Sequence, residues 1–406
     1  MSDRSNSSAS AAALSPRKAR LPFANAWFFP AAALYAALVL PYSVLALLGL
    51  LPALPGLATS TGHAHEMLFG FALAVIAGYL LGPQPLRFTL ALLSCWALAR
   101  LGFLLWPGSW LALASTSAFA AGLAWKVLQR FLGAAKKWRN QTVAPVVAGL
   151  GLLSAIASGG FAAGFDRLML EEALLLVAIL MFFMGGRIIA PAIAGYAQSR
   201  GWRLEARVQP AIEGAVLILL GLALLLNLLP WPLTQQLTGA VLVAAALLTA
   251  IRLLRWQPWR CARPDLLTLL LGYAWLAIGL LLLGLGTLLP ALPLNATLHT
   301  LTVGALGSLT FAVMARTRLL YRFRDPAAQP WIQPVALLIS LAALARVLPA
   351  LLNQPQQGWL LLAAGCWSLA FWRWSCCSGV VARHTRTAIA VKLAAESSAG
   401  TLARYA

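Results

Sequence analysis

The sequence carries little charge, and most of that charge has one sign. Only 10% of its 406 residues are charged, with 30 Lys and Arg against 10 Asp and Glu, whereas a soluble domain has about 25% charged residues. Hydrophobic residues make up 61% of the chain, and its mean hydropathy is +0.82. This composition excludes an ordinary soluble protein and indicates an integral membrane protein.

Motifs of the common soluble enzymes are also missing. The sequence has no Walker loop, no dinucleotide fingerprint, no HExxH and no nucleophile elbow. Its five cysteines show no CxxC spacing and are interpreted as reduced packing residues. The net charge of +20 does not indicate nucleic-acid binding, because no soluble fold is present to display the basic loops.

Long apolar runs account for most of the chain. A helix needs about 20 apolar residues to cross a bilayer, and backbone groups in lipid must be satisfied within a helix or a closed barrel. The sequence therefore predicts an all-α polytopic bundle over residues 25–382, between a disordered tail, 1–24, and a C-terminal tail, 383–406. Its twelve predicted spans are 27–52, 63–82, 86–106, 109–129, 143–164, 168–190, 210–230, 236–254, 266–290, 295–316, 331–352 and 358–380.

The basic residues predict the orientation. All Lys and Arg except Arg100, Arg167 and Arg346 fall in the tails, in the connections that follow even-numbered spans, or at the adjoining span ends. Cytoplasmic loops retain Lys and Arg. Both termini are therefore predicted to be cytoplasmic.

Three of the four histidines are predicted to share one depth in the membrane. His63 and His65 open span 2 in GHAHEMLFG, and His299 lies four residues into span 10. Both spans run inward, so His299 lies roughly 6 Å below the outer edge. Ionisable residues inside a membrane mark functional sites by default, and imidazole suits haem iron or copper. The preferred pair for clamping a haem is His65 with His299.

The neighbours of these histidines have several open roles. On a regular helix His63 and His65 point about 200° apart, and His63 shares a stripe with Glu66 and Met67. Glu66 is interpreted as orienting a ligating imidazole, with direct ligation and proton relay as alternatives. Met67 is a candidate metal ligand or a packing residue. Arg187, after a Gly-Gly pair, either binds an anionic group such as a haem propionate or snorkels to the interface.

Four motifs together resemble the NnrS family of bacterial membrane proteins. They are HAHEMLFG, GGRIIAP, LGYAW and the LHTLTVGALG…MAR segment. The resemblance implies twelve inner-membrane spans, bound haem and copper, and a role in nitric oxide or nitrosative stress during denitrification. The residues that match the family pattern are His63, His65, Glu66, Arg187, His299 and Arg316.

The chain also departs from the family pattern. Leu270 and Tyr321 stand where family members tend to have histidine or a histidine-containing turn. Fewer histidines imply a simplified site, with haem kept and copper lost as one outcome. Whether the protein is an enzyme stays open. The alternatives are a secondary transporter, with Gly/Pro-interrupted helices around a midplane site, and an assembly factor for a respiratory enzyme.

Overall fold

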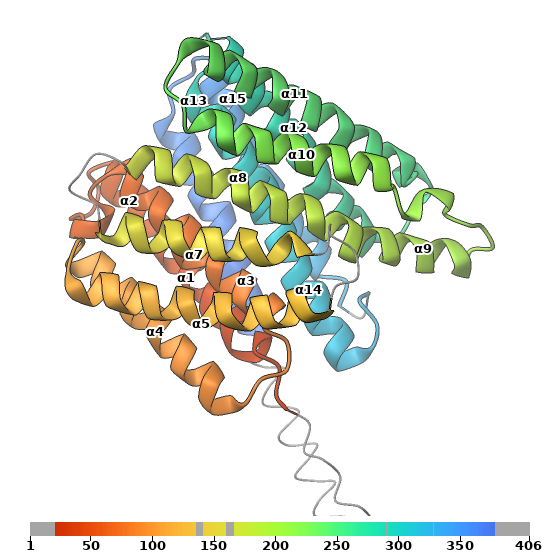
Figure 1. Ribbon diagram of the computed structural model, residues 1–406, viewed down its shortest axis with the longest axis horizontal. Coiled ribbons are helices and arrows are strands. Elements are labelled where there is room, and N and C mark those ends of the chain that lie inside the picture. The colour runs from red at the N-terminus through yellow and green to blue at the C-terminus, as the bar shows by residue number, and fades with distance from the viewer. Residues whose placement is uncertain (1–20, 135–140, 160–165, 290, 328, 378–406) are drawn as a thin grey trace, which may run out of the picture.

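The computed structural model describes residues 21–134, 141–159, 166–289, 291–327 and 329–377. Within these ranges the chain is a bundle of long helices without named strands (Figure 1). Eleven helices are long and apolar enough to cross a membrane, and Val143–Gly159 is a shorter apolar helix. The predicted all-α polytopic fold is therefore confirmed, while most of both predicted tails lies outside the described residues.

Each of the twelve predicted spans contains a helix. Nine of them have one uninterrupted helix: α1 (Asn25–Leu47), α4 (Leu86–Leu105), α5 (Trp110–Ala134), α7 (Val143–Gly159), α10 (Pro210–Asn227), α11 (Pro232–Arg255), α12 (Pro264–Leu288), α15 (Ile332–Leu351) and the last helix, Gln357–Cys377. The short 3₁₀ turns η1 (Pro55–Leu57), η4 (Glu205–Arg207) and η5 (Pro258–Arg260) lie in connections.

The other three spans each contain a π-helical segment. Span 2 consists of α2 (Ser60–His65), η2 (Glu66–Ala72) and α3 (Leu73–Leu80). Span 6 consists of α8 (Asp166–Met184), η3 (Gly185–Ile189) and α9 (Ala190–Ser199), and span 10 of α13 (Leu294–His299), η6 (Thr300–Gly307) and α14 (Ser308–Phe323). π-Helical turns are rare and often occur at functional sites. All three overlap sequence motifs quoted above: η2 overlaps HAHEMLFG, η3 lies in GGRIIAP and η6 lies in LHTLTVGALG.

These three spans form the centre of the bundle. Their most apolar windows are 72%, 67% and 83% buried, whereas the other candidate spans are 28–56% buried. They also contact one another, through α2 with α8, α8 with η6, and α3 with α14. Spans 2, 6 and 10 are four spans apart, so the chain reads as three units of four spans, each giving its second span to the centre.

The outer spans close a ring around this centre. The last helix of each unit packs against the first helix of the next, α5 on α7 and α11 on α12. The final helix returns to the first one, because Trp367 donates its indole N–H to the carbonyl of Ala36 at 3.2 Å. Large apolar side chains face outward, as expected for a surface in contact with lipid.

One connection differs from its predicted form. Residues 191–209 are predicted as a connection, but α9 extends to Ser199. Pro191 lies in the first turn of α9, where its missing N–H is tolerated, and η3 precedes it directly. The chain therefore continues as a helix past Pro191, because the π-helical η3 gives way to the α-helical α9 just before this proline.

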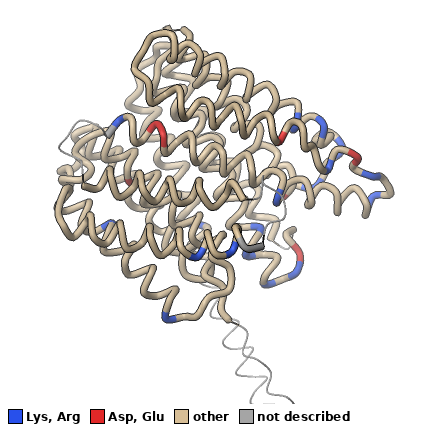
Figure 2. The backbone as a smooth tube through the Cα atoms, in the orientation of Figure 1, with Lys and Arg blue, Asp and Glu red and all other residues tan. Residues whose placement is uncertain are grey.

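The charges are distributed as the orientation requires. Most Lys and Arg lie in the right and lower parts of the view, near the ends of α5, α9 and α11 (Figure 2). The opposite end of the bundle, where α2 lies, carries few of them. Which end faces the cytoplasm stays a prediction from the sequence.

Candidate functional site

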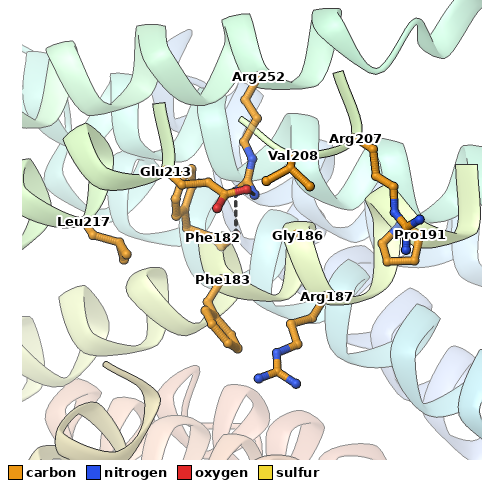
Figure 3. Close-up of a pocket in the computed structure, with 10 residues that line it drawn as sticks. All are labelled: Phe182, Phe183, Gly186, Arg187, Pro191, Arg207, Val208, Glu213, Leu217 and Arg252. Atoms are coloured by element: carbon orange, nitrogen blue, oxygen red, sulfur yellow. Dashed lines mark hydrogen bonds and ion pairs between the residues drawn. The ribbon is translucent and has the colours of Figure 1, made fainter. Parts of the chain in front are cut away.

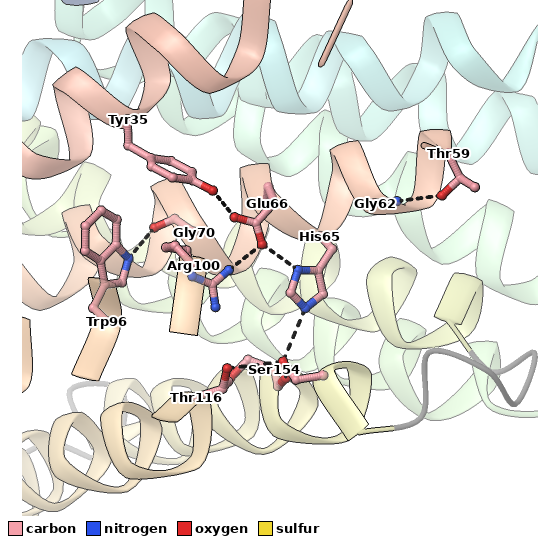
Figure 4. A network of polar contacts seen from close by, with 11 residues as sticks. Tyr35, Thr59, Gly62, His65, Glu66, Gly70, Trp96, Arg100, Thr116 and Ser154 are labelled. Carbon is pink, nitrogen blue, oxygen red and sulfur yellow. Dashed lines mark hydrogen bonds and ion pairs between the residues drawn. The ribbon is translucent and has the colours of Figure 1, made fainter. Parts of the chain in front are cut away.

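Glu66 lies at the centre of a buried polar network at the start of span 2 (Figure 4). Arg100 donates to its Oε1 at 2.6 Å, and Nδ1 of His65 lies 2.9 Å from the same oxygen. Tyr35 donates its hydroxyl to Oε2. Glu66 is 1% exposed and Arg100 is 3% exposed, so the ion pair between them is removed from solvent.

The second ring nitrogen of His65 faces another pair of spans. Its Nε2 lies 3.4 Å from the hydroxyl of Ser158 on α7, which in turn lies 3.2 Å from that of Thr116 on α5. The ring stacks on Phe103 with centroids 3.7 Å apart and planes 7° from parallel. Because Glu66 only accepts, Nδ1 of His65 carries a proton. Both nitrogens of His65 therefore have protein partners.

Gly70 allows the network to close. A Cβ at this position would lie 2.9 Å from Cε1 of Tyr35, 3.1 Å from Oε2 of Glu66 and 3.2 Å from Cδ of Arg100. The carbonyl of Gly70 accepts the indole N–H of Trp96 at 2.9 Å. The glycine of the HAHEMLFG motif thus admits a tyrosine, a carboxylate and an arginine side by side.

His63 points in a different direction from His65, as the helix geometry predicts. Its Nδ1 lies 2.7 Å from the hydroxyl of Ser43 on α1. Ser43 gives its own proton to the carbonyl of Leu40 at 2.7 Å, so Nδ1 of His63 is the donor to Ser43. The lone pair of His63 is therefore on Nε2.

His299 has the same tautomer and lies near His63. Its Nδ1 donates to the carbonyl of Asn295 at 2.6 Å, which again leaves the lone pair on Nε2. The two imidazoles are close enough for their charges to interact, and Arg346 on α15 interacts with both. Spans 2 and 10 thus place His299 and His63 within electrostatic range of each other. The predicted pair of His65 with His299 stays a prediction.

The arginines of these clusters were not among the predicted site residues, although the sequence marked them. Arg100 and Arg346 are two of the three basic residues that break the one-sided charge pattern. Arg100 pairs with Glu66, and Arg346 lies beside the two histidines and donates to Gln356 at 3.0 Å. The sequence signal for these two residues was therefore their position: each is an arginine on the predicted outer side, where few Lys and Arg occur. The third exception, Arg167, pairs with Glu171 at 2.8 Å.

Arg187 lies near the opposite end of the bundle, in η3. It lines a cavity of about 330 Å³ with Arg207, Glu213 and Arg252 (Figure 3). Glu213 pairs with Arg252 at 2.8 Å. Figure 1 places α2 and α9 at different ends of the bundle, so Arg187 belongs to a separate site, and its predicted role in binding a cofactor stays a prediction.

Arg316 and Met67 are the remaining predicted residues. Arg316 donates to Asp265 at 2.6 Å, and Asp265 also accepts two hydrogen bonds from Arg263 at 2.6 and 2.7 Å. These bonds raise the pKa of Arg263, in the connection before α12, above its usual value. Arg316 lies roughly 25 Å along its span from His299, at 1.5 Å per residue. Met67, in η2, packs against the hydrophobic core.

The three π-helical segments of the central spans thus overlap the sequence motifs of spans 2, 6 and 10. The model of the NnrS protein family matches residues 21–384. The chain belongs to the NnrS family. No curated protein and no solved structure matches it. Family membership supports a nitric-oxide-associated membrane protein, as the sequence resemblance implied.

Proposed function

We propose that this NnrS family member is a haem-containing inner-membrane protein that acts in the response to nitric oxide or nitrosative stress. The observation that carries the proposal is that His63 and His299, on two central spans, lie within electrostatic range of each other and each keeps its lone pair on Nε2. Metal-bound imidazoles usually donate their second N–H to an oxygen, which fixes the tautomer. Nδ1 of both histidines is engaged in this way, by Ser43 and by the carbonyl of Asn295.

The donor set favours haem over a protein-bound copper ion. Among the described residues, no group of three or more His, Cys, Asp and Glu could hold a metal ion. Haem iron already has four porphyrin nitrogens and needs only one or two axial ligands from the protein. Two imidazoles are therefore sufficient for haem, whereas copper, also implied by the family, would need further ligands.

Each residue around His63 and His299 would have its own role in holding the haem. Nε2 of His63 and of His299 would hold the haem iron, and Ser43 and the Asn295 carbonyl would keep the two rings in place. Arg346 would attract an anionic group of the cofactor. When bound, haem would supply a redox-active iron, and nitric oxide would bind that iron where one of the two imidazoles leaves it. His65 and Glu66 would support this end of span 2 through the Arg100 network.

An optical and haem-content measurement tests the proposal. We expect purified wild-type protein to show a Soret band, and we expect His63→Ala and His299→Ala to lose most of it. His65→Ala should retain haem per folded molecule, because both its ring nitrogens already have partners. His384→Ala, in the predicted cytoplasmic tail, is the matched control and should resemble the wild type.

Two results would change the proposal. Loss of haem in His65→Ala with retention in His63→Ala would return the ligand role to the pair of His65 and His299. A protein without Soret absorption, even after haem-supplemented expression, would exclude the haem assignment altogether.

A further inference from the structure

The cavity at the end of span 6 has an excess of positive charge. It is about 330 Å³ in volume and lies between η3 and the start of α10 (Figure 3). Three arginines, Arg187, Arg207 and Arg252, line it against one carboxylate, Glu213. Phe182 and Phe183 contribute apolar surface beside these charges. A cavity with charged and apolar walls suits an anion that carries an apolar group.

The three arginines are not equivalent. Arg252 is 2% exposed and donates to Glu213 at 2.8 Å, to the hydroxyl of Tyr273 at 3.1 Å and to the carbonyl of Phe182 at 3.1 Å. These bonds fix Arg252 in the protein. Its positive charge is matched by Glu213, so it contributes little net charge to the cavity.

Arg187 and Arg207 lack such partners. Among the described residues, no carboxylate forms an ion pair with either one, and both are exposed. The guanidinium of Arg187 lies 5.3 Å from the ring centre of Phe131 and 5.1 Å from that of Phe183. Cation–π contacts of this kind orient a guanidinium. The N–H donors, which lie in the plane of the guanidinium itself, stay available for hydrogen bonds. Two positive charges therefore face the cavity without a counter-ion from the described residues.

The local backbone holds the cavity in this form. Arg187 lies inside η3, and the preceding Gly186 lets Arg252 approach closely, because a Cβ there would lie 2.7 Å from Nη2 of Arg252. Both Arg252 and Glu213 can thus pack directly against the π-helical turn. Arg187 is thus placed by a rigid element of the central span, whereas Arg207 lies in η4, in the connection before α10.

We propose that this cavity binds the phosphate group of an anionic membrane lipid. Arginine recognises phosphate with two parallel hydrogen bonds, and basic pockets between spans on the cytoplasmic side bind phospholipid head groups. The orientation predicted from the basic residues places the cavity at that surface. The apolar walls would receive the glycerol and upper acyl region, which a free phosphate ion does not have.

Lipid binding to the purified full chain tests this site. Native mass spectrometry in detergent would measure the affinity for phosphatidylglycerol, with phosphatidylcholine and inorganic phosphate as comparison ligands. We expect preference for phosphatidylglycerol, and a loss of affinity of at least tenfold in the Arg187→Gln, Arg207→Gln double variant. Arg255→Gln, an exposed arginine of the same end that does not line the cavity, is the matched control and should bind as the wild type.

The outcomes separate the lipid site from its alternatives. An unchanged affinity in the double variant overturns the proposal. Competition by inorganic phosphate at equal affinity, with the same dependence on both arginines, assigns the site to free phosphate and overturns the lipid. Arg187→Lys with Arg207→Lys keeps the charge without the planar fork, and should lose less affinity than the Gln pair. None of these readouts depends on bound haem, so failure here and failure of the haem proposal are distinguishable.

Discussion

Two buried arginine–glutamate pairs, one near each end of the bundle, lie beside π-helical segments and differ in how they are closed. Arg100 and Glu66 are 3% and 1% exposed, and Tyr35 and His65 complete the coordination of the carboxylate. Arg252 and Glu213 are 2% and 19% exposed, and two further arginines face the same cavity. An arginine–glutamate pair beside a π-helical segment is thus part of a closed network at one end of the bundle, and lines a cavity at the other end.

The largest expected effect follows from breaking the closed network. Glu66→Gln removes the only negative charge bound to the buried Arg100 guanidinium in the described network. Removing one partner of a buried ion pair costs about 3–5 kcal/mol. We expect a marked fall in thermal stability in detergent, measured by loss of monodisperse protein on heating.

The control for this variant is an exposed pair of the same end. Glu171→Gln removes the partner of Arg167, whose side chain is 70% exposed, and exposed pairs contribute roughly 0.2–1 kcal/mol. Equal losses in the two variants would show that the Glu66 network is not structural. Replacing both Glu66 and Arg100 with Met should recover much of the loss, because no uncompensated charge then remains.

A smaller effect is expected from closing the space at Gly70. Gly70→Ala places a methyl group against Tyr35, Glu66 and Arg100 at 2.9–3.2 Å, and overpacking of this kind costs about 1–3 kcal/mol. Gly186→Ala would place a methyl group 2.7 Å from Nη2 of Arg252, the atom that donates to Glu213, so we expect a loss of the same order. Thermal unfolding measures both variants under one condition, and a Gly70→Ala variant as stable as the wild type would contradict the description of a closed network.

The smallest effect is expected at the open site. Arg187→Gln in lipid-free detergent should change stability by no more than about 0.5 kcal/mol, as for an exposed side chain without an ion pair. Arg252→Gln, which removes donors to Glu213, Tyr273 and the Phe182 carbonyl, should destabilise clearly. If Arg187→Gln is as destabilising as Arg252→Gln, then Arg187 is a structural residue and not a ligand-binding one.

The spans could be predicted because lipid imposes a length and a composition on each helix. The helix boundaries were less accessible: span 6 continues from Met184 through η3 to Ser199, although Pro191 reads as a breaker. The sequence placed Glu66 on the stripe of His63, whereas in the structure its carboxylate contacts His65. The partners Tyr35, Ser43 and Ser158 were not expected, because they come from other spans and carry no positional signal in a single sequence.

Sequence alone determined that this chain is a polytopic α-helical membrane protein and where its motifs lie along the spans, since hydrophobic length and charge asymmetry act locally along the chain. The common depth of three histidines stays a prediction of the same kind. Only the tertiary structure decided which helices meet. It enclosed His65 among Glu66, Ser158 and Phe103, bonded His63 to Ser43 of another span, and gathered the arginines of the cavity. The physical reason is that rotation about each helix axis is set by packing against neighbours that are remote in sequence.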